Sequence, residues 1–415
     1  MTARAGPRPM PIYLDNHATT RLDARVLEAM LPWLTDRYGN AGSATHAMGR
    51  EAREAVEGAR RRFAAAIGAE PREIVFTSGA TEAINLALQG AAARDRGRDG
   101  EGTTPGAIVT LATEHPAVLD TCDHLERLGH RVERLPVAPQ QGSVVPGAVD
   151  VGSLDEALRV GKPFLVSVLL ASNEIGVVQD LPAIAAACRG HGALLHLDCT
   201  QALGRMPVDV GALGADLASF SAHKVHGPKG SGALWVRRRG RPVRVEPLVF
   251  GGGQERGLRS GTHDVAGIVG MAVAAELAVA ERAVDAARMR GLRDRLWDRL
   301  AAGIDGLALN GPPLGASFPD GTPRRLVNNL NVRVPGVDGQ TLLATLDGAD
   351  LAVSSGSACS SEQPRPSHVL LALGLDDDQA RASLRFGLSR LTTESEIEEA
   401  ARLVIDGVAR LRGMA

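Results

Sequence analysis

The residue types best suited to covalent chemistry gather in one short segment of this chain, residues 219–230, which reads SFSAHKVHGPKG. The chain has only three lysines, and two of them, Lys224 and Lys229, lie in this segment. A lysine amine attacks carbonyl groups once desolvation or a neighbouring cation removes its proton, whereas an arginine guanidinium stays protonated at neutral pH. The segment is therefore a candidate Schiff-base site, and the alternative is a surface loop that follows a strand.

Three other segments place polar groups directly after an apolar run. Residues 77–82 (TSGATE) open a helical pattern, where small residues and free amides favour a phosphate group, although a well-capped helix explains them equally. His115 could stack on an aromatic cofactor and move protons, or it is a loop histidine. Asp198 ends a run reading HLD, and a buried carboxylate needs a partner such as a pyridinium nitrogen.

A stretch of small residues, 353–361 (VSSGSACSS), carries one thiol, Cys359. A cysteine in such a stretch suits a nucleophile, which must be a thiolate and must reach its target, but an incidental cysteine in a turn is also possible. The four cysteines are widely spaced and form no CxxC pair, so neither a zinc site nor a disulfide framework is indicated. We interpret Cys199 as a small buried hydrophobe.

The elements that must position these residues alternate between apolar runs and helical patterns. The predicted strands are 73–77, 107–112, 164–170, 193–198, 217–221 and 233–237, and the predicted helices between them are 81–94, 116–128 and 181–189. Continuous apolar runs that alternate with helices predict an α/β fold with a mainly parallel sheet buried on both faces. In such sheets, functional groups gather at the carboxyl ends of the strands.

The C-terminal part has a different pattern. Glycine-rich or polar breaks lie at 94–105, 251–262 and 312–325, and a long helical region follows the second of them to about residue 302. An alternating strand is predicted at 327–334, followed by two helical segments around Ser389. This part is predicted to be a smaller α+β domain.

Composition is that of an ordinary soluble globular protein. The chain has 415 residues, is 44% hydrophobic and 23% charged, and carries a net charge of −2, so two domains are expected and neither nucleic acid nor a membrane is indicated as a partner. The N-terminus lacks the apolar core of a secretory signal, and the most apolar helical stretch, 265–280, is too short to span a membrane. A cytoplasmic location is expected.

Taken together, these segments resemble the cysteine desulfurase family, pyridoxal phosphate enzymes of the class-V aminotransferase type that supply sulfur for iron–sulfur clusters and thiolated cofactors. The resemblance covers the chain from Ile12 to about Arg412 and rests on several motifs in the family's order. The motifs are REIVFTSGATEAINLAL, TEHPAVLDTC, NEIGVVQD, HLDCTQALG, SFSAHKVHGPKG, GGGQERGLRSGT, SSGSACSS and SLRFGLSR.

The resemblance implies a role for each matching residue. Lys224 would form the Schiff base with the cofactor and shuttle protons, His115 would stack on its ring and assist acid–base steps, and Cys359 would attack the substrate sulfur to form a persulfide. Asp198 would pair with the ring nitrogen. The other cofactor-binding residues would be Ala80, Thr81, Gln201, Ser221, His223 and Thr262, the last reaching the phosphate of the other subunit. Asn173 and Arg385 would hold the substrate carboxylate. Lys229 is predicted to be a turn or surface residue.

The resemblance also implies an architecture and partners. It implies the fold-type I transferase fold, with a mainly parallel seven-stranded sheet in a large domain (14–282) and a small α+β domain formed by 1–13 with 283–415. The expected cofactor is pyridoxal 5′-phosphate, the substrate L-cysteine, and the assembly a homodimer. The expected partner is a sulfur-acceptor protein, for example an iron–sulfur scaffold. The stretch around Cys359 resembles the family's long-loop class.

Some positions depart from the family's pattern, and two other functions stay open. Ser172 stands where the family often has asparagine, Cys199 stands where alanine is usual, and the end at Ala415 is shorter than in housekeeping members. The last departure leaves the sulfur acceptor undefined among cluster, tRNA-thiolation and DNA-sulfur pathways. The alternatives are a selenocysteine lyase or other β-eliminating lyase, in which Cys359 is dispensable, and a non-catalytic sulfur-relay partner.

Overall fold

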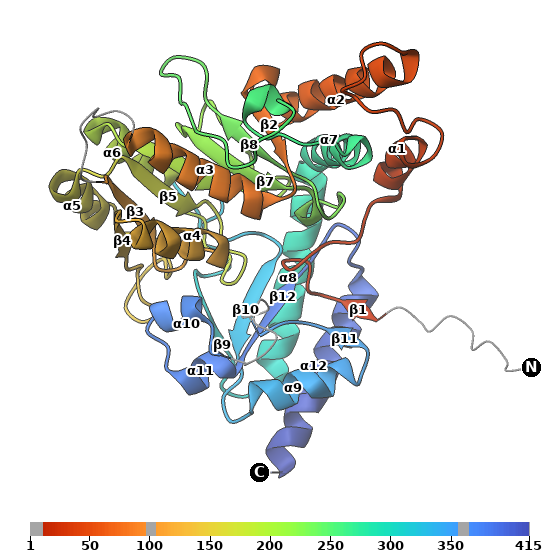
Figure 1. Ribbon diagram of the computed structural model, residues 1–415. Helices are drawn as coiled ribbons and strands as arrows, with labels where there is room; N and C mark the ends of the chain where they lie inside the picture. The colour runs from red at the N-terminus through yellow and green to blue at the C-terminus, as the bar shows by residue number, and fades with distance from the viewer. Residues whose placement is uncertain (1–10, 97–104, 356–364, 415) are drawn as a thin grey trace, which may run out of the picture.

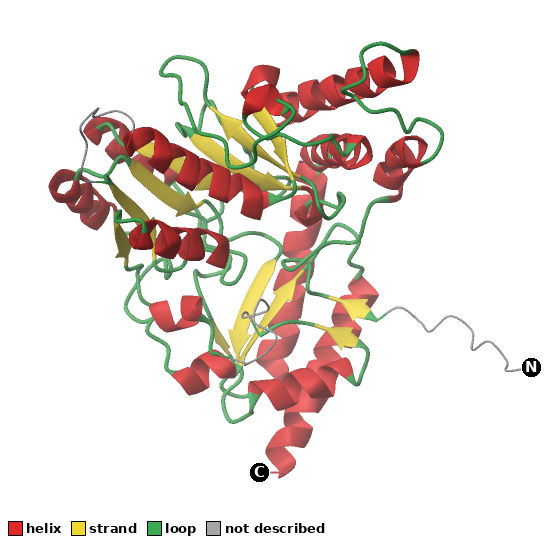
Figure 2. Ribbon diagram, viewed as in Figure 1, coloured by secondary structure: helices red, strands yellow, loops and turns green. Residues whose placement is uncertain are grey.

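A central sheet of seven strands carries the fold, with helices on both faces (Figures 1 and 2). The computed structural model describes residues 11–96, 105–355 and 365–414. The strand order is β2-β8-β7-β6-β5-β3-β4. The strands are β2 (Ile74–Thr77), β3 (Ala107–Leu111), β4 (Arg131–Leu135), β5 (Leu165–Leu169), β6 (Leu194–Asp198), β7 (Leu217–Ser221) and β8 (Gly232–Val236). β8 is the one reversed strand of this sheet: it pairs antiparallel with β2 and β7, and the other pairings are parallel, so the prediction of a mainly parallel sheet is confirmed.

Burial explains which strands could be recognised from the sequence. Four of the predicted strands, β2, β5, β7 and β8, are buried at every residue, as expected for a sheet covered on both faces. The edge strand β4 was not predicted. It reads RVERL and leaves two of its five residues exposed, so it lacks the continuous apolar run of the central strands.

Two separate hydrophobic cores lie against the two faces of the sheet. On one face, α3 (Ala80–Arg96) and α4 (Pro116–Arg127) pack against apolar strand residues such as Val75 and Leu217. The other face carries a larger core, in which the Phe63 ring contacts the rings of Phe76 and Phe220. The helices on that side are α1 (Ala24–Leu34), α2 (Ala47–Ala66), α5 (Val151–Gly161), α6 (Leu181–His191) and α7 (Val265–Ala280).

Short 3-10 helices join several of these elements. They are η1 (Pro71–Glu73), η2 (Ala222–Lys224) and η3 (Glu255–Gly257). The second of them follows directly from β7 and contains the candidate Schiff-base lysine.

The C-terminal part has its own core and lies below the large sheet in the view of Figure 1. Its helices are α8 (Arg282–Gly303), α9 (Gly339–Asp347), α10 (His368–Ala372), α11 (Asp377–Arg381) and α12 (Glu394–Met414). Its strands are β9 (Ala308–Leu309), β10 (Asn329–Arg333) and β12 (Ser383–Gly387) in one sheet, and β1 (Ile12–Tyr13) paired with β11 (Leu351–Ala352). The N-terminal segment therefore returns to the C-terminal part, where Leu14 is fully buried in the same core as α8 and α12.

Two predictions for this part need correction. The strand predicted at 327–334 forms as β10, but four of its five residues are buried, so its two faces do not alternate between core and solvent. The two helical segments predicted around Ser389 form as α11 and α12, but the residues between them include a strand that was not predicted, β12, which pairs with β10. This strand reads SLRFG, and all five residues are buried, including Arg385. The arginine interrupts the apolar run by which a buried strand is recognised in the sequence.

Candidate active site

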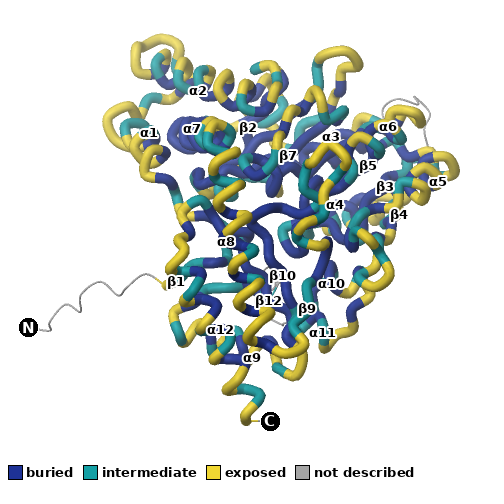
Figure 3. Tube along the Cα trace, turned by 180° about the vertical axis from the view of Figure 1, so that it is seen from behind, coloured by how far each residue is buried: buried dark blue, intermediate teal, exposed yellow. Residues whose placement is uncertain are grey.

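The predicted site residues converge at the carboxyl edge of the sheet. Because β2, β3, β5, β6 and β7 run in the same direction, the segments that follow them meet around one cavity of about 470 Å³. Nine of the predicted residues line this cavity: Ala80, Thr81, His115, Asn173, Asp198, Gln201, Ser221, His223 and Lys224. Figure 3 shows the molecule from behind, where most of the sheet and the segments between it and the C-terminal part are buried.

Lys224 lies on the turn that follows β7, and its amine points back to the N-terminal segment. The Nζ atom donates hydrogen bonds to the carbonyl oxygens of His17 (2.6 Å) and Ala18 (2.7 Å). These two carbonyl groups hold the amine at the cavity wall. Burial and the nearby Lys224 charge lower the pKa of the neighbouring His223 to about 4, so that ring is neutral at physiological pH.

His115 and Asp198 stand at the ends of β3 and β6. His115 caps α4: its Nδ1 accepts the Ala117 amide at 3.1 Å, and Pro116 occupies the first helical turn as predicted. Burial lowers the pKa of His115 while the Asp198 charge opposes that change, so the ring is neutral near pH 7. Asp198 is 3% exposed, and its Oδ1 accepts the Thr200 amide at 2.9 Å. The site therefore offers a neutral imidazole and a fixed carboxylate on one cavity wall.

The turn from β2 into α3 forms a small-residue cradle. The segment Ser78-Gly79-Ala80-Thr81 lines the cavity at the N-terminus of a 17-residue helix, where free amides and the helix dipole favour an anion. Gly79 has φ +154°, and a Cβ placed there would meet no atom within 4 Å, so this position faces open space. Gly232 approaches the same turn closely, since its own Cβ would lie 2.5 Å from the carbonyl carbon of Gly79.

Arg385 lies beside the cavity rather than in its lining. It is 1% exposed, its Nη2 donates to Asp15 Oδ1 at 2.8 Å, and its Nη1 donates to the Asn173 carbonyl at 3.4 Å. Its buried Nε has no hydrogen-bond partner among the described residues. The two predicted carboxylate-binding residues are therefore brought together across 212 residues of sequence.

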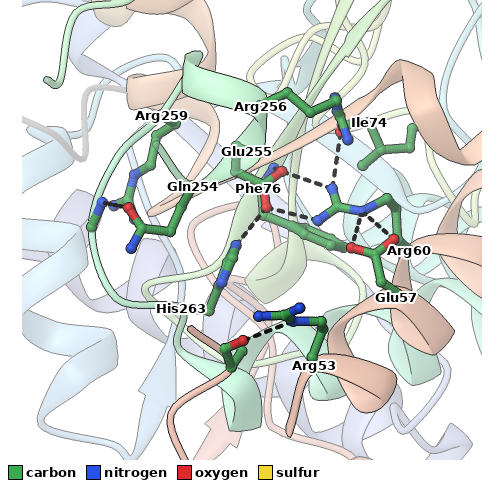
Figure 4. Close-up of polar contacts among 12 residues, drawn as sticks. Arg53, Glu57, Arg60, Ile74, Phe76, Gln254, Glu255, Arg256, Arg259 and His263 are labelled. Carbon is green, nitrogen blue, oxygen red and sulfur yellow. Dashed lines mark hydrogen bonds and ion pairs between the residues drawn. The ribbon is translucent and has the colours of Figure 1, made fainter. Parts of the chain in front are cut away.

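Thr262 does not reach the cavity of its own chain. It is exposed at the end of the glycine-rich loop 251–262, which is held by the Glu255 carboxylate (Figure 4). Glu255 accepts two hydrogen bonds from Arg60, both 2.7 Å, one from the Phe76 amide (2.9 Å) and one from His263 (2.7 Å). Burial alone would raise the pKa of Glu255, but the hydrogen bonds from His263 and Arg60 lower it to about 2.

Cys359 lies outside the described residues. The segment before it is anchored by backbone pairing of Ser354 with Arg385. The segment after it is anchored by two side chains: Ser367 donates to Glu174 at 2.5 Å, and the His368 ring bonds to the Glu114 carbonyl at 2.9 Å. Both described ends are therefore tied to residues next to the cavity.

Sequence reasoning missed several residues of this site. Thr19 lines the cavity, and its hydroxyl lies 3.1 Å from His223 Nδ1; it belongs to residues 15–20 (DNHATT), for which no role was predicted. Glu82 also lines the cavity, where its carboxylate accepts from Arg259 (2.8 Å) and from the Ser78 amide (2.7 Å). Lys229 is exposed at the surface, as predicted, and also lies at the cavity wall.

Comparisons with known proteins agree with this geometry. A lysine and a carboxylate at the carboxyl edge of a mainly parallel sheet are the arrangement of a pyridoxal phosphate enzyme, and residues 12–400 match the family described as Aminotransferase class-V, to which the chain belongs. Within it, the chain is a member of the cysteine desulfurase family. It is 47% identical over 409 residues to the cysteine desulfurase IscS of Salmonella schwarzengrund, covering 98% of this chain and 94% of that protein.

Solved structures give the same result. A NifS-like protein matches with a TM-score of 0.85 and 37% identity over 97% of this chain and 100% of its own. A structure described as SspA in complex with cysteine matches with a TM-score of 0.75 and 32% identity over 92% of this chain and 99% of its own. The fold is that of the fold-type I transferases, as predicted.

The cavity fits the cofactor that this family uses. The open cradle at Gly79 suits a phosphate group, Asp198 offers a buried carboxylate to a ring nitrogen, and Lys224 offers an amine to an aldehyde carbon.

Proposed function

We propose that this chain is a pyridoxal-phosphate-dependent cysteine desulfurase that converts L-cysteine to L-alanine and passes the sulfur to Cys359. The observation that carries the proposal is the single cavity that joins Lys224, His115 and Asp198 in a chain 47% identical to cysteine desulfurases. When bound, the cofactor supplies an electron sink for the substrate carbanion. The chain's own residues bind and orient the substrate, and they move protons.

Each residue of the cavity would have a role that follows from its position. Ser78–Thr81, Ser221 and His223 would hold the phosphate, and Asp198 would keep the ring nitrogen protonated because a buried carboxylate prefers a cationic partner. Lys224 Nζ would remove the substrate's α-proton, and His115, with Nδ1 occupied by the Ala117 amide, would offer Nε2 for proton transfer. Arg385, with Asn173, would bind the substrate carboxylate.

Sulfur transfer would then occur at Cys359. Its thiolate attacks the substrate sulfur, the carbon–sulfur bond breaks, and the electron pair stays on the substrate β-carbon, which takes up a proton. L-cysteine and the enzyme thiol thus give alanine and an enzyme persulfide, with no external oxidant or reductant. An acceptor protein, such as an iron–sulfur scaffold, would collect this sulfur.

We also propose the homodimer and the two-domain organisation that are expected from the sequence. Thr262, exposed on a loop held by Glu255, would complete the phosphate site of a second subunit, and this supports a homodimer. The cores support a large domain (14–282) and a small domain (1–13 with 283–415), with Leu14 at the boundary packed into the small-domain core. No helix in the described ranges is long and apolar enough to cross a membrane, and we propose a cytoplasmic location.

The test uses purified protein with L-cysteine under reductant. We expect visible cofactor absorbance that is lost in Lys224→Ala, and alanine and sulfide formation that falls sharply in Cys359→Ala while the absorbance remains. Sulfide release by Cys359→Ala at the wild-type rate would contradict the thiol's role and favour a β-eliminating lyase. Turnover of cysteine and of selenocysteine, measured in the wild type and in Cys359→Ala, distinguishes a cysteine desulfurase from a selenocysteine lyase.

A further inference from the structure

A second cavity, separate from the active-site cavity, is lined by four arginines and no acid. It has a volume of about 150 Å³ and lies where the turn after β6 meets the start of α8 and the residues before β10. Its basic residues are Arg205, Arg282, Arg290 and Arg325, and its other lining residues are apolar or small. Within the part of the chain that the structure describes, no aspartate or glutamate lines it.

Arg205 is a buried cation with neutral partners only. It is 8% exposed, and its guanidinium donates to the Gln201 carbonyl, to Gln201 Oε1 and to the Lys224 carbonyl at 2.9–3.0 Å. Burial lowers its pKa to about 10, so it stays charged at neutral pH. Its hydrogen bonds are made, but no carboxylate among the described residues neutralises its charge.

Arg325, which lines the same cavity, is also a buried cation with neutral partners. It is 1% exposed and donates to the carbonyls of Pro312 and Asn310 and to the side chain of Asn329. Burial lowers its pKa to about 9, which still leaves it a cation at physiological pH. Two buried cations without a counter-ion at one cavity are costly, because neutral hydrogen-bond acceptors offset only part of the cost of removing a charge from water.

The third and fourth arginines come from one face of α8. Arg282, Ala286 and Arg290 are four residues apart, so their side chains share a helix face, and the small Ala286 leaves room between the two guanidinium groups. Neither arginine forms an ion pair within the described ranges. Asp285, also on α8, lines a neighbouring space of about 30 Å³ together with Arg205, but the two residues form no ion pair within the described ranges.

We propose that this cavity binds a small oxyanion of the phosphate or sulfate type, held by the guanidinium groups of Arg205, Arg282, Arg290 and Arg325. Guanidinium groups bind such oxygens with paired, charge-assisted hydrogen bonds. A water molecule takes roughly 30 Å³ in the liquid, so the cavity has room for a five-atom oxyanion but not for a nucleotide. The proposal is independent of the desulfurase reaction.

Calorimetric titration of the holoenzyme with sulfate, at ionic strength held constant with potassium chloride, tests the proposal. The holoenzyme is used because the bound cofactor's phosphate occupies the other anion site. We expect saturable binding of one sulfate per chain, and phosphate should compete for it. The titration extends to about 10 mM sulfate, so that a site with a Kd in the low millimolar range would still be detected. If the heat at that concentration is no larger than the heat of dilution, the proposal is overturned.

Variants distinguish the cavity from general surface charge. The double variant Arg282→Gln/Arg290→Gln should weaken sulfate binding by at least about tenfold, because two of the four charge-assisted contacts are lost. The charge-matched control Arg61→Gln/Arg127→Gln, on α2 and α4 away from the cavity, should bind as the wild type does. Equal losses in both double variants would assign the binding to net charge and overturn the site.

A crystal of the holoenzyme soaked in selenate gives a readout that needs no variant. We expect an anomalous selenium peak between Arg205 and Arg325. A peak elsewhere only, or no peak, would overturn the proposal.

Discussion

Asp198 is the residue whose charge matters most to the proposed chemistry. It is buried at the end of β6, and one of its oxygens is already committed to the Thr200 amide. The second oxygen would face the cofactor ring from the cavity wall that also carries His115. Position and charge are therefore separable here, because an asparagine can keep the amide contact while losing the charge.

Asp198→Asn should lower L-cysteine turnover by roughly 10²-fold or more, since a neutral amide does not hold a ring nitrogen protonated. Alanine formation measures turnover, and visible absorbance measures how much cofactor is bound. Asp180→Asn is the matched control, because Asp180 caps α6 outside the cavity and asparagine caps helices equally well. Unchanged turnover in Asp198→Asn at full cofactor occupancy would contradict the assignment.

At the scale of elements, the glycine-rich loop 251–262 is held in place by a buried ion pair. Glu255 and Arg256 have positive φ values of 49° and 59°, a conformation that non-glycine residues rarely adopt. The Glu255 side chain is held by Arg60 of α2 and by the Phe76 amide of β2. The residues that follow β2 form the candidate phosphate cradle. One carboxylate thus ties the loop to both elements.

Glu255→Gln should reduce the free energy of unfolding by about 3–5 kcal/mol, because it removes the buried carboxylate that pairs with the buried Arg60 cation and leaves only the largely exposed Glu57 as its partner. Urea unfolding followed by circular dichroism measures the change. Glu156→Gln breaks the exposed pair with Arg159 and should change stability by less than about 1 kcal/mol. A similar small effect for both variants would show that the buried pair does not hold the loop.

At the scale of the whole molecule, buried neutral histidines make stability depend on pH. Burial lowers the pKa of His196 to about 3 and that of His226 to about 4. Below pH 6.5 the unfolded chain binds protons that the folded chain does not, so folding stability falls as the pH falls from about 6.5 toward 4. Above pH 6.5 these residues are neutral in both states and contribute no slope.

The urea midpoint should therefore be lower at pH 5.5 than at pH 7.5, with His196 contributing about 1.4 kcal/mol per pH unit below pH 6.5. His196→Asn loses hydrogen bonds to Ser167 and Ser219 and should be less stable at pH 7.5, but its stability should fall less steeply with acid. Equal steepness in the variant and the wild type would contradict this account.

The sequence by itself determined the strands of the sheet's centre and the residues that follow them. Continuous apolar runs mark β5 and β7 because both of their faces are buried, and the polar residues after them, such as Asn173 and Lys224, then meet at one edge. This reasoning is local. It needs only the pattern of neighbouring residues and the rule that parallel strands end together.

Only the tertiary structure decided which distant residues meet. Arg385 reaches Asn173, Arg60 meets Glu255 across 195 residues, and four arginines from three segments share a cavity without an acid. The exposed strand β4 and the buried strand β12 also escaped prediction, because charged residues hide their strand character. Such contacts depend on how the elements pack, and burial of a charged side chain follows from its packed neighbours rather than from its place in the sequence.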